Sequence, residues 1–259
     1  MSILLSNDCS DYHIGSKLTT KVLKNLLSKH DKVWTSKTGN PSKHNLVVIN
    51  GEGSFHDDNS NSKVIYETAL KARNSNIPVC LINSVIDNIS FDLSIFNYIS
   101  ARDSISADNK YPFTLDPCFY EEVRESPEGE YVLFVDSVIP DKSKQIFNAY
   151  KSYRGPKKYI KMVDYHSRKV FEIFSKSSFI ISGRYHGVVF AIMHKKPFVA
   201  LESNTHKIKG LLLDLGLLGN LIEEISDVKS VIHSNKPRIN RTDIKLNLER
   251  MVSACIIHI

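Results

Sequence analysis

Short apolar runs alternate with helix-period patterns along most of this chain of 259 residues. Leu46–Ile49 and Phe179–Ser182 are apolar runs of the length expected for buried strands. Leu18, Val22 and Leu26 recur every four residues, as they would on one face of a helix. Repeated alternation of strand and helix predicts parallel sheets covered by helices, and therefore an α/β fold.

The same patterns predict the order of elements and the domain boundaries. Strands are expected over residues 3–5, 46–49, 79–82, 131–135, 179–182 and 198–201. Helices are expected over about 15–28, 62–73, 143–153 and 164–176, from about 186, and over 208–215. The acidic stretch EEVRESPEGE carries Pro and Gly and predicts a linker. We therefore expect two domains, over 1–120 and 130–235. A polar loop near 235–240 should precede a last helix in 240–259, which packs back on the N-terminal domain.

Composition excludes several classes of protein. With 42% hydrophobic and 24% charged residues, the chain suits a globular protein rather than a disordered or collagen-like one. It has no apolar run of the roughly 18 to 20 residues that a membrane span needs, and MSILLSNDCS does not resemble a secretory signal. The four cysteines lie far apart without a CxxC pair, which favours reduced thiols. We expect a cytoplasmic protein, with the inner face of the cell membrane as an alternative location.

Positive charge is concentrated in the second half of the chain. Residues 1–129 hold 13 Lys and Arg against 16 Asp and Glu, a net charge of −3, whereas residues 130–259 hold 21 against 12, a net charge of +9. Residues 142–169 contain nine basic residues, interleaved tyrosines and Asp164 as the one acid. This stretch is interpreted first as a solvated helix and loop. A membrane-surface or lipid-phosphate contact is the second interpretation. Nucleic-acid binding is the third, since no recognisable motif accompanies the charge.

In parallel α/β sheets, ligands bind beyond the carboxyl ends of the strands. A first cluster of this kind, NGEGSFHD, directly follows the strand expected at 46–49. Gly51 and Gly53 are expected to let the backbone turn tightly beside a ligand, with Ser54 next to them and the Glu52 carboxylate facing the site. The pattern matches neither a dinucleotide fingerprint nor a P-loop, and a structural turn is an equal alternative.

A second cluster, SGRYHG, directly follows the strand expected at 179–182 and leads into a helix. Helix N-termini favour anions because their backbone N–H groups are free and the helix dipole is positive there. Beside Gly183, Arg184 adds a planar guanidinium suited to carboxylate or phosphate, and His186 adds a group that exchanges protons near neutral pH. An Arg-x-His pair at this junction favours an anion site.

Two further clusters carry cations. Lys207 opens the helix after the strand at 198–201. The helix dipole disfavours a cation in the first turn, so the lysine suggests a bound anion there; an exposed helix lysine is the alternative. Arg102 follows an apolar segment at 96–99 and, taken alone, suggests a surface residue paired with Asp103.

Taken in order, these clusters resemble the polysaccharide pyruvyl transferase family over about residues 5–220. The matching segments are SNDCSDYHIGSKLTTKVLKNLL, VVINGEGSFHDD, ISARDSIS with LDP, FIISGRYHGVVFAIMHKKPFVAL, and SNTHKIKGLLLDLGL. Glu52 stands where the family commonly has a third glycine, and the chain is short, so the acceptor site is the part most open to difference.

The resemblance implies two Rossmann-like parallel-sheet domains facing a cleft, in the manner of GT-B enzymes. It implies transfer of pyruvate from phosphoenolpyruvate to a sugar as a ketal, on a surface polysaccharide or a lipid-linked precursor. No cofactor, metal ion or nucleic acid is expected. Arg184 and His186 match the family's arginine and histidine that hold the donor, while Lys207 matches its lysine and Arg102 its Arg-Asp arginine. Arg184, Arg102 and Lys207, with the turn at Gly183, would supply the charges that bind the donor.

The chemistry suggests further roles. Ketal formation needs an acid and a base suited to neutral pH. His186 is the candidate acid or phosphate partner, and Glu52, with Asp8 in reserve, is the candidate base for the acceptor hydroxyl. Rival interpretations are a GT-B glycosyltransferase that uses a nucleotide-activated sugar, with Tyr185 as the ring against the base, and a non-catalytic scaffolding protein of capsule assembly.

Overall fold

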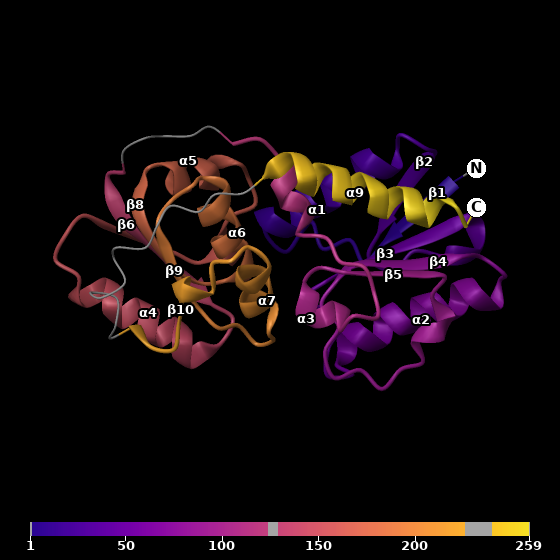
Figure 1. The fold of residues 1–259 in the computed structure, drawn as a ribbon, viewed down its shortest axis with the longest axis horizontal. Coiled ribbons are helices and arrows are strands. Elements are labelled where there is room, and N and C mark those ends of the chain that lie inside the picture. Colours follow the sequence, from indigo (N-terminus) through magenta and orange to yellow (C-terminus); the bar gives the residue numbers. More distant parts are fainter. Residues whose placement is uncertain (1, 124–128, 226–239, 259) are drawn as a thin grey trace. The chain divides into compact units, whose positions relative to one another are not determined.

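The computed structural model describes residues 2–123, 129–225 and 240–258, which form two compact units (Figure 1). The first unit contains Met1–Asp11, Ser16–Glu121 and Arg241–Ile259. The second contains Tyr12–Gly15 and Glu122–Asn240.

The first unit is built on a parallel sheet of five strands in the order β2-β1-β3-β4-β5. Its strands are β1 (Ser2–Ser6), β2 (Lys32–Ser36), β3 (Leu46–Glu52), β4 (Val79–Ser84) and β5 (Tyr98–Ala101). Its helices are α1 (Ile14–Leu27), α2 (Ser60–Asn74), α3 (Ser104–Ala107) and α9 (Arg241–Ile256). Every residue of β3 and β4 is buried, which is typical of central strands with both faces covered.

The second unit repeats this topology, in the order β10-β9-β8-β6-β7, again with all strands parallel. Its strands are β6 (Tyr131–Ser137), β7 (Lys157–Ile160), β8 (Ser177–Gly183), β9 (Phe198–Leu201) and β10 (Leu221–Ile222). Its helices are α4 (Pro140–Ser152), α5 (Lys169–Ser175), α6 (Tyr185–Met193) and α7 (Lys207–Asp214). Counted from its own first strand, each unit has the order 2-1-3-4-5 of doubly wound folds.

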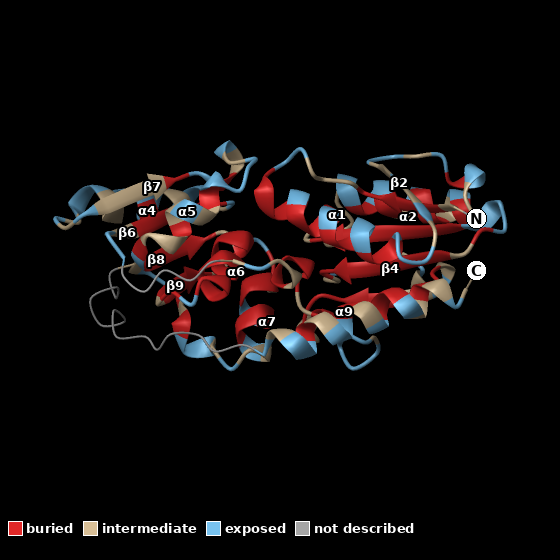
Figure 2. Ribbon diagram, turned by 90° about the horizontal axis from the view of Figure 1, so that it is seen from above, coloured by how far each residue is buried: buried red, intermediate tan, exposed pale blue. Residues whose placement is uncertain are grey.

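The predicted central strands are confirmed, and the edge strands β2, β5, β7 and β10 were not predicted, although the apolar segment noted at 96–99 overlaps β5. Figure 2 shows β4 in the colour of buried residues and β7 in that of intermediate ones. Edge strands keep one side near solvent, so they lack the continuous apolar run that marks a central strand. The basic stretch at 142–169 was interpreted as helix and loop only, and in the structure it also contains the edge strand β7.

One helix is shorter than predicted. The helix expected from 164 begins at Lys169, and Met162–Asp164 forms a 3-10 turn instead. The carbonyl of Tyr165 accepts a hydrogen bond from the Ile14 N–H at 2.8 Å, so it is engaged away from the helix at 169. The backbone of Tyr165 is accordingly extended.

The last helix packs within the first unit. Helix α9 contacts β5 and the 3-10 turn Pro117–Tyr120. Its buried side chains, spaced three or four residues apart, are Ile244, Leu248, Met251, Val252 and Cys255. The linker at 124–128 and most of the predicted loop near 235–240 lie outside the described residues.

Candidate functional site

In both units the strand order reverses next to the first strand, between β1 and β3 and between β6 and β8. Doubly wound folds bind ligands beyond the carboxyl ends of the strands at this reversal. Glu52 ends β3, and Arg184 follows β8. The leading predicted residue of each unit therefore lies at the position that the topology favours.

In the first unit, hydrogen bonds hold the Glu52 carboxylate. Glu52 is 7% exposed and adopts a left-handed backbone with φ of 45°. The Ser16 hydroxyl donates to Oε2 at 2.8 Å, and the Asn50 Nδ2 donates to Oε1 at 3.1 Å. Each oxygen of the Glu52 side chain thus accepts one hydrogen bond, and the two bonds fix its orientation.

Three asparagines at neighbouring strand ends extend this network. Asn83 Nδ2 donates to Asn50 Oδ1 at 2.8 Å, which turns the Asn50 amide nitrogen toward Glu52. Asn7 Nδ2 donates to the Asn50 carbonyl at 2.6 Å. All three are buried, and Asn83 Oδ1 has no hydrogen-bond partner within the described part of the chain. The network orients the Glu52 side chain and leaves Asn83 Oδ1 as an unused buried acceptor.

The glycine turn works differently from the prediction. Gly51 and Gly53 are not in the left-handed region; Glu52, between them, is. Gly51 is required for space, because a Cβ there would lie 2.5 Å from the Cβ of Ser84 on β4. Ser54 closes the turn, with its N–H bonded to the Gly51 carbonyl at 3.0 Å.

Asp8 lies just beyond β1 and is partly exposed. Its Oδ1 accepts from the Ser10 N–H at 2.9 Å and from the Thr20 hydroxyl at 3.2 Å. Burial raises the pKa of the adjacent Cys9 thiol to about 12, and the negative charges of Glu52 and Asp8 add to the rise. Cys9 is therefore a protonated thiol near neutral pH and not a nucleophile.

Arg102 is not the surface residue that the sequence suggested. It is 2% exposed and forms a buried ion pair with Asp116, 14 residues away in the sequence. Asp103 caps α3 by accepting from the Ser106 N–H at 2.7 Å. Asp116 also accepts from the Cys118 N–H at 2.8 Å. The Arg102 side chain thus links the segment after β5 to the turn at Asp116 in the interior of the first unit.

In the second unit, Arg184 connects Gly183, the last residue of β8, to α6 and is held by a carboxylate. Arg184 Nε lies 3.1 Å from Asp136 Oδ1, and Nη2 lies 2.6 Å from Oδ2. Asp136 belongs to β6, whose Ser137 is in register with Gly183. Arg184 Nη1 is directed to the Tyr12 hydroxyl at 3.3 Å. Burial alone lowers the pKa of Arg184, but the bonds to Asp136 outweigh it and raise that pKa above its usual value.

His186 lies inside the first turn of α6. It is 6% exposed, and its ring lies edge-on to that of His13, with 5.0 Å between centroids. A Cβ at Gly15 would lie 2.5 Å from His186 Cδ2, so glycine makes room for the imidazole. Tyr185, the ring proposed for a nucleobase, is 5% exposed and therefore offers no open face.

Lys207 is buried rather than an exposed helix lysine. It is 9% exposed and opens α7, and its Nζ donates to Asn204 Oδ1 at 2.6 Å. In the same turn, Thr205 Oγ1 and Glu202 Oε1 are buried without a hydrogen-bond partner among the residues described. The turn after β9 thus combines a buried cation with polar atoms that have no hydrogen bond. Strand β9 pairs with β8, the strand that Arg184 follows.

His56, Asp57 and Asp58 hold a loop together. His56 Nδ1 lies 2.9 Å from Asp57 Oδ2, and the Asn88 amide donates to Asp57 Oδ1 at 2.9 Å. Asp58 accepts from the N–H of Ser90 at 3.1 Å. These bonds direct the two carboxylates to loop residues rather than to a common point.

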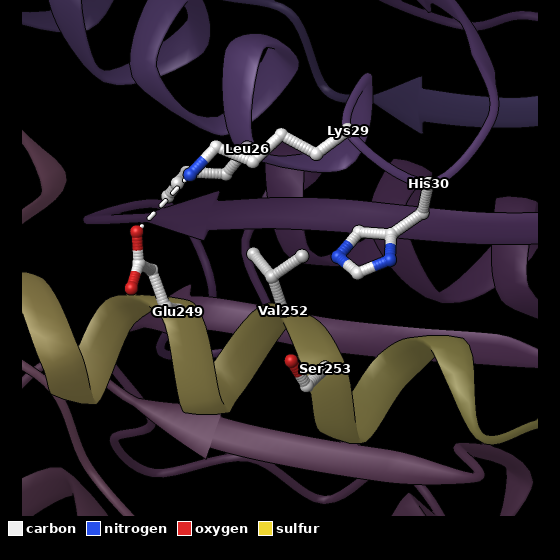
Figure 3. A pocket seen from close by; sticks show the side chains of 6 residues that line it. All are labelled: Leu26, Lys29, His30, Glu249, Val252 and Ser253. Atoms are coloured by element: carbon white, nitrogen blue, oxygen red, sulfur yellow. Dashed lines mark hydrogen bonds and ion pairs between the residues drawn. The ribbon is translucent and has the colours of Figure 1, made fainter.

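A hollow of about 240 Å³ lies between the end of α1 and α9 (Figure 3). It is lined by Leu26, Lys29, His30, Glu249, Val252 and Ser253. Lys29 Nζ and Glu249 Oε1, 3.1 Å apart, form an exposed ion pair across it. In such folds a helix runs antiparallel to the strands that it covers, so the end of α1 lies near the amino ends of the strands. The hollow therefore lies away from Glu52, which is at a carboxyl end.

A family profile for polysaccharide pyruvyl transferases matches residues 10–205, well over half of the chain. The chain belongs to the polysaccharide pyruvyl transferase family. As a family member it is a transferase, and the family implies a sugar acceptor. Comparison with curated proteins gives no match.

Solved structures with the same fold include enzymes of sugar nucleotides. The UDP-N-acetylglucosamine 2-epimerase of Rickettsia bellii matches with a TM-score of 0.61 at 9% identity, covering 99% of this chain and 95% of the epimerase. The epimerase of Neisseria meningitidis matches with a TM-score of 0.56 at 12% identity, covering 99% and 100%. An uncharacterised protein of Klebsiella pneumoniae matches with a TM-score of 0.57 at 13% identity, covering 85% and 92%. These likenesses confirm two Rossmann-like units of the GT-B type.

In this pyruvyl transferase family member, sequence reasoning missed Asp136, Tyr12 and the asparagine network. Asp136 and Asn83 do lie at the ends of apolar runs, the same signal that singled out Glu52 and Arg184. Tyr12 carries no such signal, because only the fold brings it to Arg184. None of the described helices is both long and apolar enough to cross a membrane.

Proposed function

We propose that this protein transfers pyruvate from phosphoenolpyruvate to a sugar of a surface polysaccharide or its precursor, forming a ketal. The observation that carries the proposal is Arg184, held by Asp136 at the strand-order reversal of the second unit, directly before helix α6. An arginine fixed at a helix N-terminus suits a small, highly charged anion.

The donor's chemistry fits this unit. Phosphoenolpyruvate carries a carboxylate and a phosphate, about three negative charges near pH 7. It has little apolar surface, so charge-assisted hydrogen bonds must supply most of its affinity. Asp136 engages Nε and Nη2 of Arg184, and Nη1 donates to the Tyr12 hydroxyl, so a donor bound at the Nη1 edge would share that edge with Tyr12. Lys207, Gly183 and the N–H groups of α6 complete the proposed anion site.

The reaction needs one proton delivered and two removed. Carbon 3 of the enol gains a proton and becomes a methyl group, and the bond from carbon 2 to the phosphate oxygen breaks. Two sugar hydroxyls form new bonds to carbon 2. Of the two protons that they lose, one balances the proton gained by carbon 3 and the other leaves with phosphate. Acid and base groups suited to neutral pH therefore carry the step.

We assign the base to Glu52, with Asp8 as the alternative, and the acid or phosphate partner to His186. Hydrogen bonds from Ser16 and Asn50 orient the Glu52 carboxylate, the group that would accept a hydroxyl proton. Gly51, Gly53 and Ser54 would shape the acceptor side around it. Arg102 is assigned to stability, because its guanidinium pairs with Asp116 in the interior.

The test is incubation of the purified chain with phosphoenolpyruvate and a panel of saccharides, with phosphate release followed and the product analysed for an acid-labile pyruvate ketal. We expect release that requires both substrates. Turnover of a nucleotide sugar without phosphoenolpyruvate would overturn the proposal in favour of a glycosyltransferase. Unchanged polysaccharide pyruvylation in cells carrying Arg184→Ala or His186→Ala would overturn it in favour of a scaffolding protein.

A further inference from the structure

One surface of the second unit carries many cations around a cluster of aromatic rings. We define the α4–β7 face as Lys144, Phe147, Tyr150, Lys151, Arg154, Lys157 and Tyr159, from helix α4, strand β7 and the turn between them. Lys144, Phe147, Lys151 and Arg154 are exposed. This face is not part of the proposed anion site.

The aromatic rings form one cluster that reaches solvent. Phe147 stacks on Tyr150 with centroids 6.1 Å apart and meets Tyr159 edge-on at 5.2 Å. Phe147 is 37% exposed, although it belongs to a helix whose inner face buries Ile146. An exposed phenylalanine ringed by cations is typical of surfaces that enter a membrane interface.

Two lysines lie against these rings instead of pairing with acids. Lys151 Nζ lies 4.6 Å above the Phe147 ring, and Lys157 Nζ lies 5.0 Å from the Tyr150 centroid. Lys157 Nζ also donates to the carbonyl of Tyr153 at 2.6 Å, near the end of α4. In the part of the chain that is described, Lys144, Lys151 and Lys157 form no ion pair with a carboxylate. The exposed charges of Lys144 and Lys151 are therefore available to an external anion, whereas the Lys157 ammonium is bound to backbone carbonyls.

Few acids oppose this charge. Between residues 142 and 169, Asp164 is the one acid against nine Lys and Arg. Asp141 lies in the first turn of α4, and Glu224 lies beside Gln145 and Ser152 on the flank of that helix. Glu224 thus lies on the side of α4 that carries Gln145 and Ser152, whereas Lys144, Phe147 and Lys151 share another side through their i, i+3, i+7 spacing, so the defining residues of the face include no acid.

We propose that the α4–β7 face docks on a membrane surface rich in anionic phospholipid. Juxtaposed lysines attract such a surface at distances up to a Debye length, about 10 Å at 0.1 M salt. Phe147 would add apolar contact at the interface. Single-stranded nucleic acid needs open ring faces for base stacking, whereas these rings already stack on and cross one another. The observations therefore favour a lipid surface.

The test is co-sedimentation of the full chain with phosphatidylcholine vesicles that contain about one third phosphatidylglycerol. We expect binding at 0.1 M salt that is lost at high salt and on pure phosphatidylcholine. Lys144→Glu/Lys151→Glu should lower the partition coefficient by about tenfold or more, and Phe147→Ser should lower it by a smaller factor. Phosphate release with a water-soluble acceptor should stay at the wild-type rate in these variants, so vesicle binding and the proposed activity fail separately.

A matched control is Lys63→Glu/Lys71→Glu, which changes two exposed lysines of α2 in the first unit by the same charge. It should bind vesicles as the wild type does. Equal loss in both double variants would overturn the proposal, because general charge would then explain binding. Tighter binding of single-stranded RNA than of anionic vesicles, abolished by Lys144→Glu/Lys151→Glu, would overturn it in favour of a nucleic-acid surface.

Discussion

The two units share one topology and place opposite chemistry at the same position. At the reversal of strand order, the first unit presents a carboxylate within a network of amides, Glu52 with Asn50 and Asn83. The second unit presents a guanidinium fixed by one carboxylate, Arg184 with Asp136. The fold thus determines where a functional group lies, and a few residues at strand ends determine whether that place favours a hydroxyl proton or an anion.

The two units also use arginine differently. Arg102 is 2% exposed and its pairing with Asp116 holds the turns after β5 together. Arg184 keeps one edge directed to Tyr12, away from its carboxylate. We therefore propose a stabilising role for Arg102 and a donor-binding role for Arg184, and the substitutions below separate the two roles.

The largest effect is expected from Arg102→Ala. Removing one partner of a buried ion pair leaves the Asp116 charge uncompensated, so the free energy of unfolding should fall by about 3–5 kcal/mol. Denaturant unfolding followed by circular dichroism measures it. Lys110→Ala, which removes an exposed pair with Asp108, is the control and should change stability little. A stable Arg102→Ala protein that fails to bind phosphoenolpyruvate would move Arg102 into the donor site.

Arg184→Ala should lower kcat/KM by about 10²–10³-fold, because a charge-assisted clamp on the donor is lost. Steady-state phosphate release measures the change, and a thermal melt reports how far the fold tolerates an unpaired Asp136. Arg184→Lys keeps the charge but loses the planar pair with Asp136. Its activity should therefore lie between that of the wild type and that of Arg184→Ala. Wild-type turnover in both variants would remove Arg184 from the mechanism.

Glu52→Gln should lower kcat by about 10²-fold, as expected for loss of a general base, with a smaller change in KM. The amide has nearly the shape of the carboxylate, so a melting curve should show the fold intact. The parallel variant Asp8→Asn decides between the two candidate bases. A larger loss in Asp8→Asn than in Glu52→Gln would exchange their roles.

Asn50→Ala should have the smallest effect of the series. It removes the donor to Glu52 and leaves Asn83 with a second unused polar atom, so the free energy of unfolding should fall by about 1–3 kcal/mol. We also expect kcat to fall by about tenfold, because Glu52 then loses one of the two hydrogen bonds that orient its carboxylate. Asn61→Ala, at an exposed position of α2, is the control. An unchanged kcat would limit Asn50 to a structural role.

The central strands and the strand-end residues could be predicted from the sequence. The runs at Leu46 and Phe179 are buried on both faces, so their composition alone marks them as strands. Glu52, Arg184 and Lys207 then follow from a rule about where such sheets bind ligands. Edge strands such as β7 escape this reasoning, because three of the four residues of β7 are only half-buried and its sequence, KKYI, has no apolar run.

Partners across the fold could not be predicted. The Asp103 carboxylate caps α3, and Arg102 forms its buried ion pair with Asp116, which lies 14 residues further along the chain. Burial of Lys207 depends on packing around the turn after β9, and the left-handed Glu52 depends on the approach of β4 to Gly51. A residue's own pattern indicates its element, whereas its partner is determined by elements far away in the sequence.

The central claim is that the cations of the second unit bind phosphoenolpyruvate. Isothermal titration calorimetry of the full chain with phosphoenolpyruvate tests it most directly, with Arg184→Lys and Lys207→Ala measured beside the wild type. The account predicts saturable, equimolar binding by the wild type, weakened in both variants. Heat changes no larger than those of dilution, under conditions where a nucleotide sugar binds, would contradict it.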